Sequence, residues 1–243
     1  LGSVAAQPVS NLVVPGNVTA IHDAALLQSI IISGNLTNAG TIYALSSNPV
    51  VNSASFSAAN IFNQSGALFT SILPAQGLPG FVSAVSNLNL NLYAAGDIIN
   101  GGTISSAGNL SLTAGASIMN QAQAVMVATQ NLNLTAATLN NAGLVSATVG
   151  SINMDVASIY NRGVIESIRG NIAVTNTTAP ALGIEILSDH GGIISALLGE
   201  ITTVTADSAL KYNTTISGGT IRAEEILLSS GDGHLNLSID DIQ

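Results

Sequence analysis

The chain has 243 residues, of which only 7% are charged, and its formal net charge is -9 with four Lys and Arg residues. This scarcity of basic residues argues against nucleic acid as a partner, because phosphates are bound by clustered Lys and Arg. The 47% hydrophobic content is too high for a disordered chain, and the 3% aromatic content predicts a core of thin aliphatic layers. Because the sequence has no cysteine, it excludes disulfides and thiolate metal sites.

The N-terminal segment LGSVAAQPVS lacks the basic and apolar regions of a signal peptide, so we expect the chain to be an internal piece of a longer protein. The longest apolar stretch, from Ala24 to Ile32, is shorter than the roughly 20 residues that a membrane-spanning helix needs. We therefore expect no membrane insertion.

The first sign of a repeat is the phrase GNLTNAGTIYAL at 34–45, which FNQSGALFT at 62–70 resembles weakly. Between 46 and 86 the period breaks, and we expect an irregular coil or an external loop insertion there. This segment contains all four phenylalanines of the chain, Phe56, Phe62, Phe69 and Phe81. Their rings either shield the edge of the core or form a protruding contact surface, since binding function concentrates on loops carried by rigid scaffolds.

The most regular repeats occupy residues 87–174. Copies open at Asn109, Asn131, Ser151 and Asn171, a period of 20 to 22 residues, and aliphatic residues alternate with polar ones within each copy. Alternation at period two predicts short strands with one buried face. A unit this short has no room for a crossover helix, so it buries its apolar side by winding into a coil and stacking on its neighbours. The repeats therefore predict an all-β, single-stranded parallel β-helix.

Two sets of residues are expected to stack along this helix. The first set is a pair of interior aliphatic rows, Leu110, Leu132, Ile152 and Ile172 beside Leu112, Leu134, Met154 and Val174. The second is a structural ladder of corner asparagines, Asn100, Asn120, Asn140 and Asn161, whose amides hydrogen-bond from coil to coil. Recurrence in every coil indicates an architectural role, because a catalytic residue is needed once.

Residues 175–243 carry degenerate copies such as GGIISALLGEITTV and HLNLSIDD, which still alternate and still contain Gly turns. We therefore expect residues 1–243 to form one continuous β-helix of roughly ten coils of ~20–22 residues. The bias of parallel crossovers favours a right-handed winding.

The phrase NLNLTAATLNNAGLVSA at 131–147 resembles the haemagglutinin repeats of filamentous haemagglutinin-like exoproteins, bacterial surface adhesins exported by two-partner secretion. The similarity is good over 87–171 and looser on both sides. It implies a right-handed β-helix at a cell surface, and an internal shaft fragment of such a protein.

Three kinds of site compete with a purely structural role for these residues. A polysaccharide-active enzyme would need paired carboxylates, and the nearest clusters are Glu185, Asp189 and His190 with Glu200, and Asp232 with His234. Calcium would find oxygen ligands at Gly231-Asp232-Gly233 and at Asp240-Asp241. Eight N-x-S/T sequons, at Asn17, Asn35, Asn63, Asn109, Asn133, Asn176, Asn213 and Asn236, are possible glycosylation sites. Solvated turn residues explain the first two more simply, so we expect no enzyme, no metal and no cofactor.

The sequence thus favours an extracellular or cell-surface shaft that also offers an attachment surface, with a host or environmental glycan or surface receptor as its partner. The alternative is a self-assembling fibre or sheath that associates end to end or laterally. From Leu1 to Gly150 the acidic residues are Asp23 and Asp97, without any Lys or Arg, so this part has a nearly neutral polar surface. Such a surface is compatible both with a shaft that attaches to a glycan or receptor and with a fibre that assembles from copies of the chain.

Overall fold

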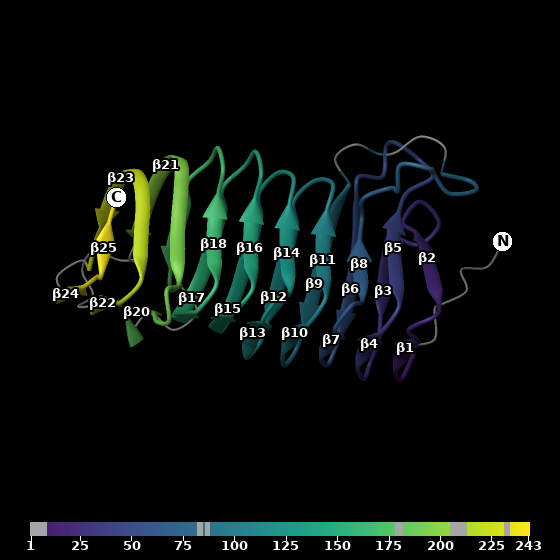
Figure 1. The fold of residues 1–243 in the computed structure, drawn as a ribbon. Coiled ribbons are helices and arrows are strands. Elements are labelled where there is room, and N and C mark those ends of the chain that lie inside the picture. The colour runs from purple at the N-terminus through teal and green to yellow at the C-terminus, as the bar shows by residue number, and fades with distance from the viewer. Residues whose placement is uncertain (1–8, 82–84, 86–87, 178–181, 205–212, 231–233) are drawn as a thin grey trace.

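The chain folds into a parallel β-helix, as the repeats predict, and its winding is right-handed, as the bias of parallel crossovers favours. The computed structural model describes residues 9–81, 85, 88–177, 182–204, 213–230 and 234–243. These residues contain 25 strands and no α-helix, and the strands that pair do so in parallel. In Figure 1 the chain climbs the near side of the rod, returns on the far side and advances from the N-terminal end to the C-terminal end, which is a right-handed winding.

The strands form three parallel sheets, called faces 1, 2 and 3 in the order in which each coil visits them. Face 1 contains β1 (Leu12–Val14), β4 (Leu36–Asn38), β7 (Ile61–Asn63), β10 (Ile98–Asn100), β13 (Ser117–Asn120), β20 (Ile184–Ser188), β22 (Thr214–Ser217) and β24 (Leu235–Ser238). Face 2 contains β2 (Thr19–Asp23), β5 (Thr41–Leu45), β8 (Leu68–Thr70), β11 (Thr103–Ser106), β14 (Val125–Ala128), β16 (Leu144–Ala147), β18 (Val164–Ser167) and β25 (Asp241–Ile242).

Face 3 contains β3 (Ser29–Ile31), β6 (Ser53–Ala58), β9 (Asn89–Ala94), β12 (Leu110–Ala114) and β19 (Ile172–Thr175). Four longer strands turn a corner. β15 (Leu132–Asn141) and β17 (Ile152–Asn161) run from face 3 to face 1 of the next coil, and β21 (Ile193–Val204) and β23 (Thr220–Leu228) run from face 2 to face 3. A coil begins on face 1, so coil 1 begins at β1 and coil 10 at β24.

The interior is filled by aliphatic rows that run along the rod. On face 3 the register aligns Leu110 with Leu132, Ile152 and Ile172, and it aligns Leu112 with Leu134, Met154 and Val174. These eight side chains are at most 1% exposed, so both predicted stacks are confirmed. Each fully buried aliphatic side chain of this size stabilises the fold by about 1.5–3 kcal/mol.

The expected irregular coil over 46–86 is corrected by the structure. Strands β6, β7 and β8 lie within it and pair in register with the coils on both sides. The chain leaves the stack mainly between β8 and β9, where Figure 1 shows it extending from one corner of the rod. Insertions lengthen a corner without disturbing the strands, because the strands are held by the coils above and below.

Candidate functional site

A row of buried asparagines follows the corner between faces 1 and 2. In each step Nδ2 of one asparagine donates to Oδ1 of the next over 2.8 to 2.9 Å, and the row consists of Asn38, Asn63, Asn100, Asn120, Asn141 and Asn161. These residues are at most 2% exposed. Nδ2 also donates to a backbone carbonyl of the next coil, for example from Asn120 to Leu144 over 3.0 Å. The row is therefore a structural amide ladder with its polar atoms satisfied internally.

The predicted ladder is right at Asn100, Asn120 and Asn161 and wrong at Asn140. Asn120 pairs with Asn141, whereas Asn140 points outward and aligns with Met119 and Tyr160. The step from Asn120 to the next ladder residue is 21 residues. The turn after Asn120 is two residues longer than the turn after Asn100, and the following corner between faces 3 and 1 is one residue shorter. The ladder also extends to Asn38 and Asn63, in coils where the repeat is weak in sequence.

Asparagines at the other corners bind the backbone of the next coil. Asn109 Oδ1 accepts the N–H of Asn131 over 3.0 Å, and Asn131 Oδ1 accepts the N–H of Ser151 over 2.8 Å. Several sequons belong to such positions, so their asparagines have structural partners. Asn63 is itself a ladder member with 1% exposure, so glycosylation of this sequon is incompatible with the fold.

The four phenylalanines do not form a common contact surface. Phe56 and Phe69 are 2% and 0% exposed and pack edge to face inside the rod, with ring centroids 4.9 Å apart. Phe62 is half-buried on the outer side of face 1, and Phe81 is half-buried in the excursion after β8. The prediction of a contact surface fails for Phe56 because this residue lies on the same side of β6 as the buried Ala54 and Ala58. All three side chains therefore point inward.

The acidic residues considered for catalysis are separated by the fold. Glu185 lies on face 1, in β20, whereas Glu200 lies where β21 enters face 3. Asp189 is held by Arg162, with Nε–Oδ1 2.8 Å and Nη2–Oδ2 3.2 Å, and His190 Nδ1 lies 3.0 Å from its Oδ2. The hydrogen bonds from Arg162 are the main reason why the pKa of Asp189 is lowered. The cluster is thus an ion pair at an exposed turn.

The positions considered for calcium give no assembled site in the part that the structure describes. Gly231, Asp232 and Gly233 lie outside the described residues. Asp240 Oδ2 accepts the N–H of Gly219 over 2.8 Å, which is a turn contact. Within the described ranges, no three His, Cys, Asp or Glu side chains gather as metal ligands would, and no helix is long and apolar enough to span a membrane.

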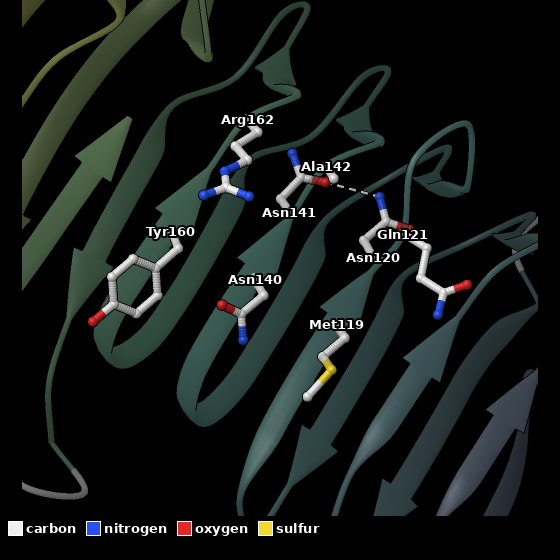
Figure 2. Close-up of a pocket in the computed structure, with 8 residues that line it drawn as sticks. All are labelled: Met119, Asn120, Gln121, Asn140, Asn141, Ala142, Tyr160 and Arg162. Atoms are coloured by element: carbon white, nitrogen blue, oxygen red, sulfur yellow. Dashed lines mark hydrogen bonds between the residues drawn. The ribbon is translucent and has the colours of Figure 1, made fainter. Parts of the chain in front are cut away.

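The outer side of face 1 carries a different kind of row. Its side chains align from coil 2 to coil 7 as Thr37, Phe62, Ile99, Met119, Asn140 and Tyr160. This row lies directly before the amide ladder in sequence, and Figure 2 shows Met119, Asn140 and Tyr160 projecting from three neighbouring coils. The residues that follow the ladder, among them Gln121, Ala142 and Arg162, form the other side of the same strip.

Two hollows interrupt this strip. The first hollow has a volume of about 430 Å³ and is lined by Thr37, Phe62, Asn63, Gln64, Ser65, Ile99 and Gln121. The second hollow has a volume of about 330 Å³ and is lined by Met119, Asn120, Gln121, Asn140, Asn141, Ala142, Tyr160 and Arg162 (Figure 2). Both volumes reach the lower end of the range of small-ligand sites, and Gln121 belongs to both hollows.

The positions of the two hollows follow from the lengths of the turns between faces 1 and 2. Four-residue turns follow Asn63 and Asn120, each closed by one backbone hydrogen bond of 3.0 Å, from Ala67 to Gln64 and from Ala124 to Gln121. Coils 4 and 6 turn with the two-residue pairs Gly101-Gly102 and Ala142-Gly143. The first hollow extends from coil 2 to coil 5 and crosses the short turn of coil 4, where Gly101 lies between Ser65 and Gln121. The second hollow extends from coil 5 to coil 7 and crosses the short turn of coil 6.

The lining of the two hollows is nearly neutral. Arg162 is the charged residue among the described residues that line them, and its guanidinium is held bidentately by Asp189. Tyr160 is 40% exposed, and its hydroxyl lies 3.4 Å from Glu185 Oε2. The remaining polar groups are amides and hydroxyls. The strip therefore offers apolar surface and neutral hydrogen-bonding groups together.

Comparisons of the chain with protein-family models, with curated proteins and with solved structures found no match. The resemblance to haemagglutinin repeats therefore remains a prediction from the repeats themselves.

Proposed function

We propose that the chain is a stiff segment of an extracellular adhesive protein that holds binding surfaces away from the cell and contributes its own neutral surface to attachment. The observation that carries this proposal is the stack itself, in which strand ladders join each coil to the next from β1 to β25. Bending the rod strains several parallel ladders at once, because neighbouring coils are joined on all three faces.

The amide ladder adds to this stiffness. Buried asparagines join six consecutive coils with hydrogen bonds that lie along the rod. A buried amide that loses its partner costs about 1–3 kcal/mol, so the ladder opposes separation of the coils. The long insertion between β8 and β9 leaves face 1 without a break, because β7 pairs with β10 across it.

Attachment at a cell surface is supported by composition and by the repeats. Solubility rests on Asn, Ser and Thr, since 7% of the residues are charged. A surface of this kind approaches a glycan layer without strong repulsion. The similarity of residues 87–171 to haemagglutinin repeats points to the same setting.

The test is negative-stain electron microscopy of the purified chain with limited proteolysis in parallel. We expect single rods about 45 Å long, from about ten coils at ~4.8 Å each, with proteolytic cuts confined to the corners. Compact round particles, or cuts within the strands of the central coils, would contradict the shaft.

A second candidate is end-to-end assembly into a fibre. The side chains of β24 are exposed, with Leu235 at 41% and Leu237 at 49%, and an uncovered strand edge templates another chain. In a longer protein, further coils would cover the same edge. Sedimentation over a hundredfold concentration range tests this candidate, and Leu237→Lys is expected to abolish any polymer. Monomers at every concentration would exclude the fibre.

A further inference from the structure

We infer that the two hollows on face 1 bind an uncharged, extended polysaccharide that runs along the rod. This inference rests on the proposed attachment function and names the ligand class and the site. The hollows lie on one strip and meet at Gln121 of coil 5. The first is lined from coils 2 to 5 and the second from coils 5 to 7, so their centres are two to three coils, roughly 10–14 Å, apart at the spacing of stacked strands. A single extended glycan of a few sugar residues is long enough to occupy both hollows.

The side chains match the two kinds of surface that a sugar ring presents. Tyr160 and Phe62 provide aromatic surface, and Ile99 and Met119 extend it, so the apolar C–H faces of a sugar find packing partners. Gln64, Gln121 and Asn140 carry amides that both donate and accept hydrogen bonds, as sugar hydroxyls require. Small-ligand sites commonly combine a largely apolar lining with a few polar groups of this kind.

Charge selects among glycans. The chain carries a net charge of -9, and the guanidinium of Arg162 is already bound by Asp189. A polyanion therefore finds no free cation in the described lining of either hollow and is repelled by the chain as a whole. A neutral polysaccharide needs no counter-charge, so the electrostatics favour this class over acidic glycans and nucleic acids.

The size and shape of the strip favour a glycan over a second copy of the protein as its ligand. A stable protein–protein interface buries roughly 1,200–2,000 Å² and is complementary over the whole area. The strip instead presents two separate hollows of about 430 and 330 Å³ divided by the turn that carries Gln121. A thin linear polymer follows such a surface, whereas a flat protein face bridges it and leaves both hollows empty.

The experiment is affinity electrophoresis in native gels, which suits a chain of net charge -9. The gels contain hydroxyethylcellulose, xyloglucan, galactomannan, laminarin or dextran, with polygalacturonate as the charged polymer. We expect retardation by at least one neutral polymer and none by polygalacturonate. Binding measured by calorimetry with oligosaccharides of the retarding polymer should strengthen up to about five sugar residues, because the lining runs over five coil spacings, from Thr37 in coil 2 to Tyr160 in coil 7.

Matched variants locate the site. Tyr160→Ala removes an aromatic surface, and Ala142→Gln fills the second hollow from an exposed turn position. Each should raise Kd at least about tenfold, equivalent to about 1.4 kcal/mol. Tyr93→Ala is the control, because Tyr93 is 50% exposed on face 3, in β9. It should leave Kd unchanged, and circular dichroism should report the same fold for all three variants.

Two results would overturn the inference. One is a lack of retardation by all five neutral polymers, and the other is retardation that Tyr160→Ala and Ala142→Gln leave intact. Self-association of the wild type that Ala142→Gln abolishes, without any glycan binding, would assign the strip to a second copy instead. Electron microscopy of the same samples keeps this outcome separate from failure of the shaft, because rods form whether or not a glycan binds.

Discussion

Coils 2 to 7 differ from the coils that flank them in the residue that begins the corner between faces 1 and 2. In the central coils the last residue of the face 1 strand is a ladder asparagine, from Asn38 to Asn161. In coil 1 the register places Val14 at this position, and in coil 8 it places Ser188 there. The difference shows what the asparagine does besides joining coils.

The amide fixes the turn. Oδ1 of Asn141 accepts the N–H of Gly143 over 3.2 Å, and the same bond to the residue two positions on recurs at Asn38, Asn100 and Asn161. The four-residue turns use left-handed residues instead, with φ 76° at Gly66 and 67° at Gln123 after two ladder asparagines, and φ 51° at His190 and 81° at Gly191 after Ser188. The side-chain hydrogen bond of the two-residue turns thus corresponds to a left-handed backbone in the four-residue turns.

The largest expected effect is that of a methyl group in a central turn. In Gly163→Ala the new Cβ would lie 2.1 Å from the carbonyl oxygen of Gly143 and 2.8 Å from two further backbone atoms of the preceding coil. Relief requires whole coils to move apart, so we expect the free energy of unfolding to fall by about 4 kcal/mol. Urea denaturation followed by circular dichroism measures the loss.

The matched change in a flanking turn is Gly191→Ala. A Cβ there meets no atom within 4 Å, so its cost is the left-handed backbone alone, about 1–2 kcal/mol. Equal losses in the two variants would show that backbone conformation, and not the close approach of coils, makes glycine necessary in the central turns.

The next effect is that of one ladder amide. Asn141→Ala leaves Gly143 N–H, Val164 O and Asn161 Oδ1 without their partner in a buried corner, so we expect a loss of about 3 kcal/mol. Asn140→Ala is the control in the adjacent position. Its side chain points outward, and such surface changes usually stay within about 0.5 kcal/mol. A larger loss for Asn140→Ala than for Asn141→Ala, measured by urea denaturation, would contradict the register that places Asn141 in the ladder and Asn140 outside it.

Asn140 and Asn141 also show how much of the fold can be predicted from the sequence. Strict alternation at period two identified the interior rows from Leu110 to Val174, because a buried strand face leaves no other placement. A fixed step of 20 selected Asn140, since turn length varies from coil to coil. The Asn-x-Gly spacing shared by Asn38, Asn141 and Asn161 was the better signal, because it reflects the hydrogen bond that closes the turn.

The strip on face 1 could not be predicted in the same way. Its outward residues, such as Met119 and Tyr160, follow no repeat, and the hollows depend on which turns are long. The sequence groups Phe62 with the other phenylalanines. In the structure Phe62 instead lines a hollow together with Ile99 of coil 4 and Gln121 of coil 5. Along 53–58 three serines alternate with Ala54, Phe56 and Ala58, and this period-two pattern by itself predicts that Phe56 is buried.

A smaller effect is expected in coil 1, which lacks the ladder. His22 aligns with the buried Ala44, and its ring packs edge to face on Phe56 at 5.0 Å. Burial lowers the pKa of His22 below its ordinary value of 6.5, although Asp23 opposes the shift. Above pH 6.5 the ring is neutral in both states. As pH falls below this value the unfolded chain binds a proton first, so stability declines until pH reaches the folded pKa.

The measurement is the urea midpoint between about pH 8 and about pH 5, together with the imidazole signals of His22 by NMR. His22→Leu should remove the part of the acid-side decline that begins near neutrality. A His22 pKa above 6.5, or an unchanged pH dependence in the variant, would contradict burial of this ring in coil 1.

The smallest effect belongs to the exposed ion pair where the ladder ends. Hydrogen bonds from Arg162 lower the pKa of Asp189, so its contribution is present above the ordinary value of 3.8 and is lost as pH falls through the folded pKa. Asp189→Asn should lower the urea midpoint slightly at neutral pH and low salt. The difference from wild type should vanish in about 1 M NaCl, because salt at this concentration screens exposed charges within ~3 Å. A difference that persists in high salt would show that Asp189 fixes the turn after Ser188 as the amide of Asn141 fixes its own turn, and the two corners would then differ less than their residues suggest.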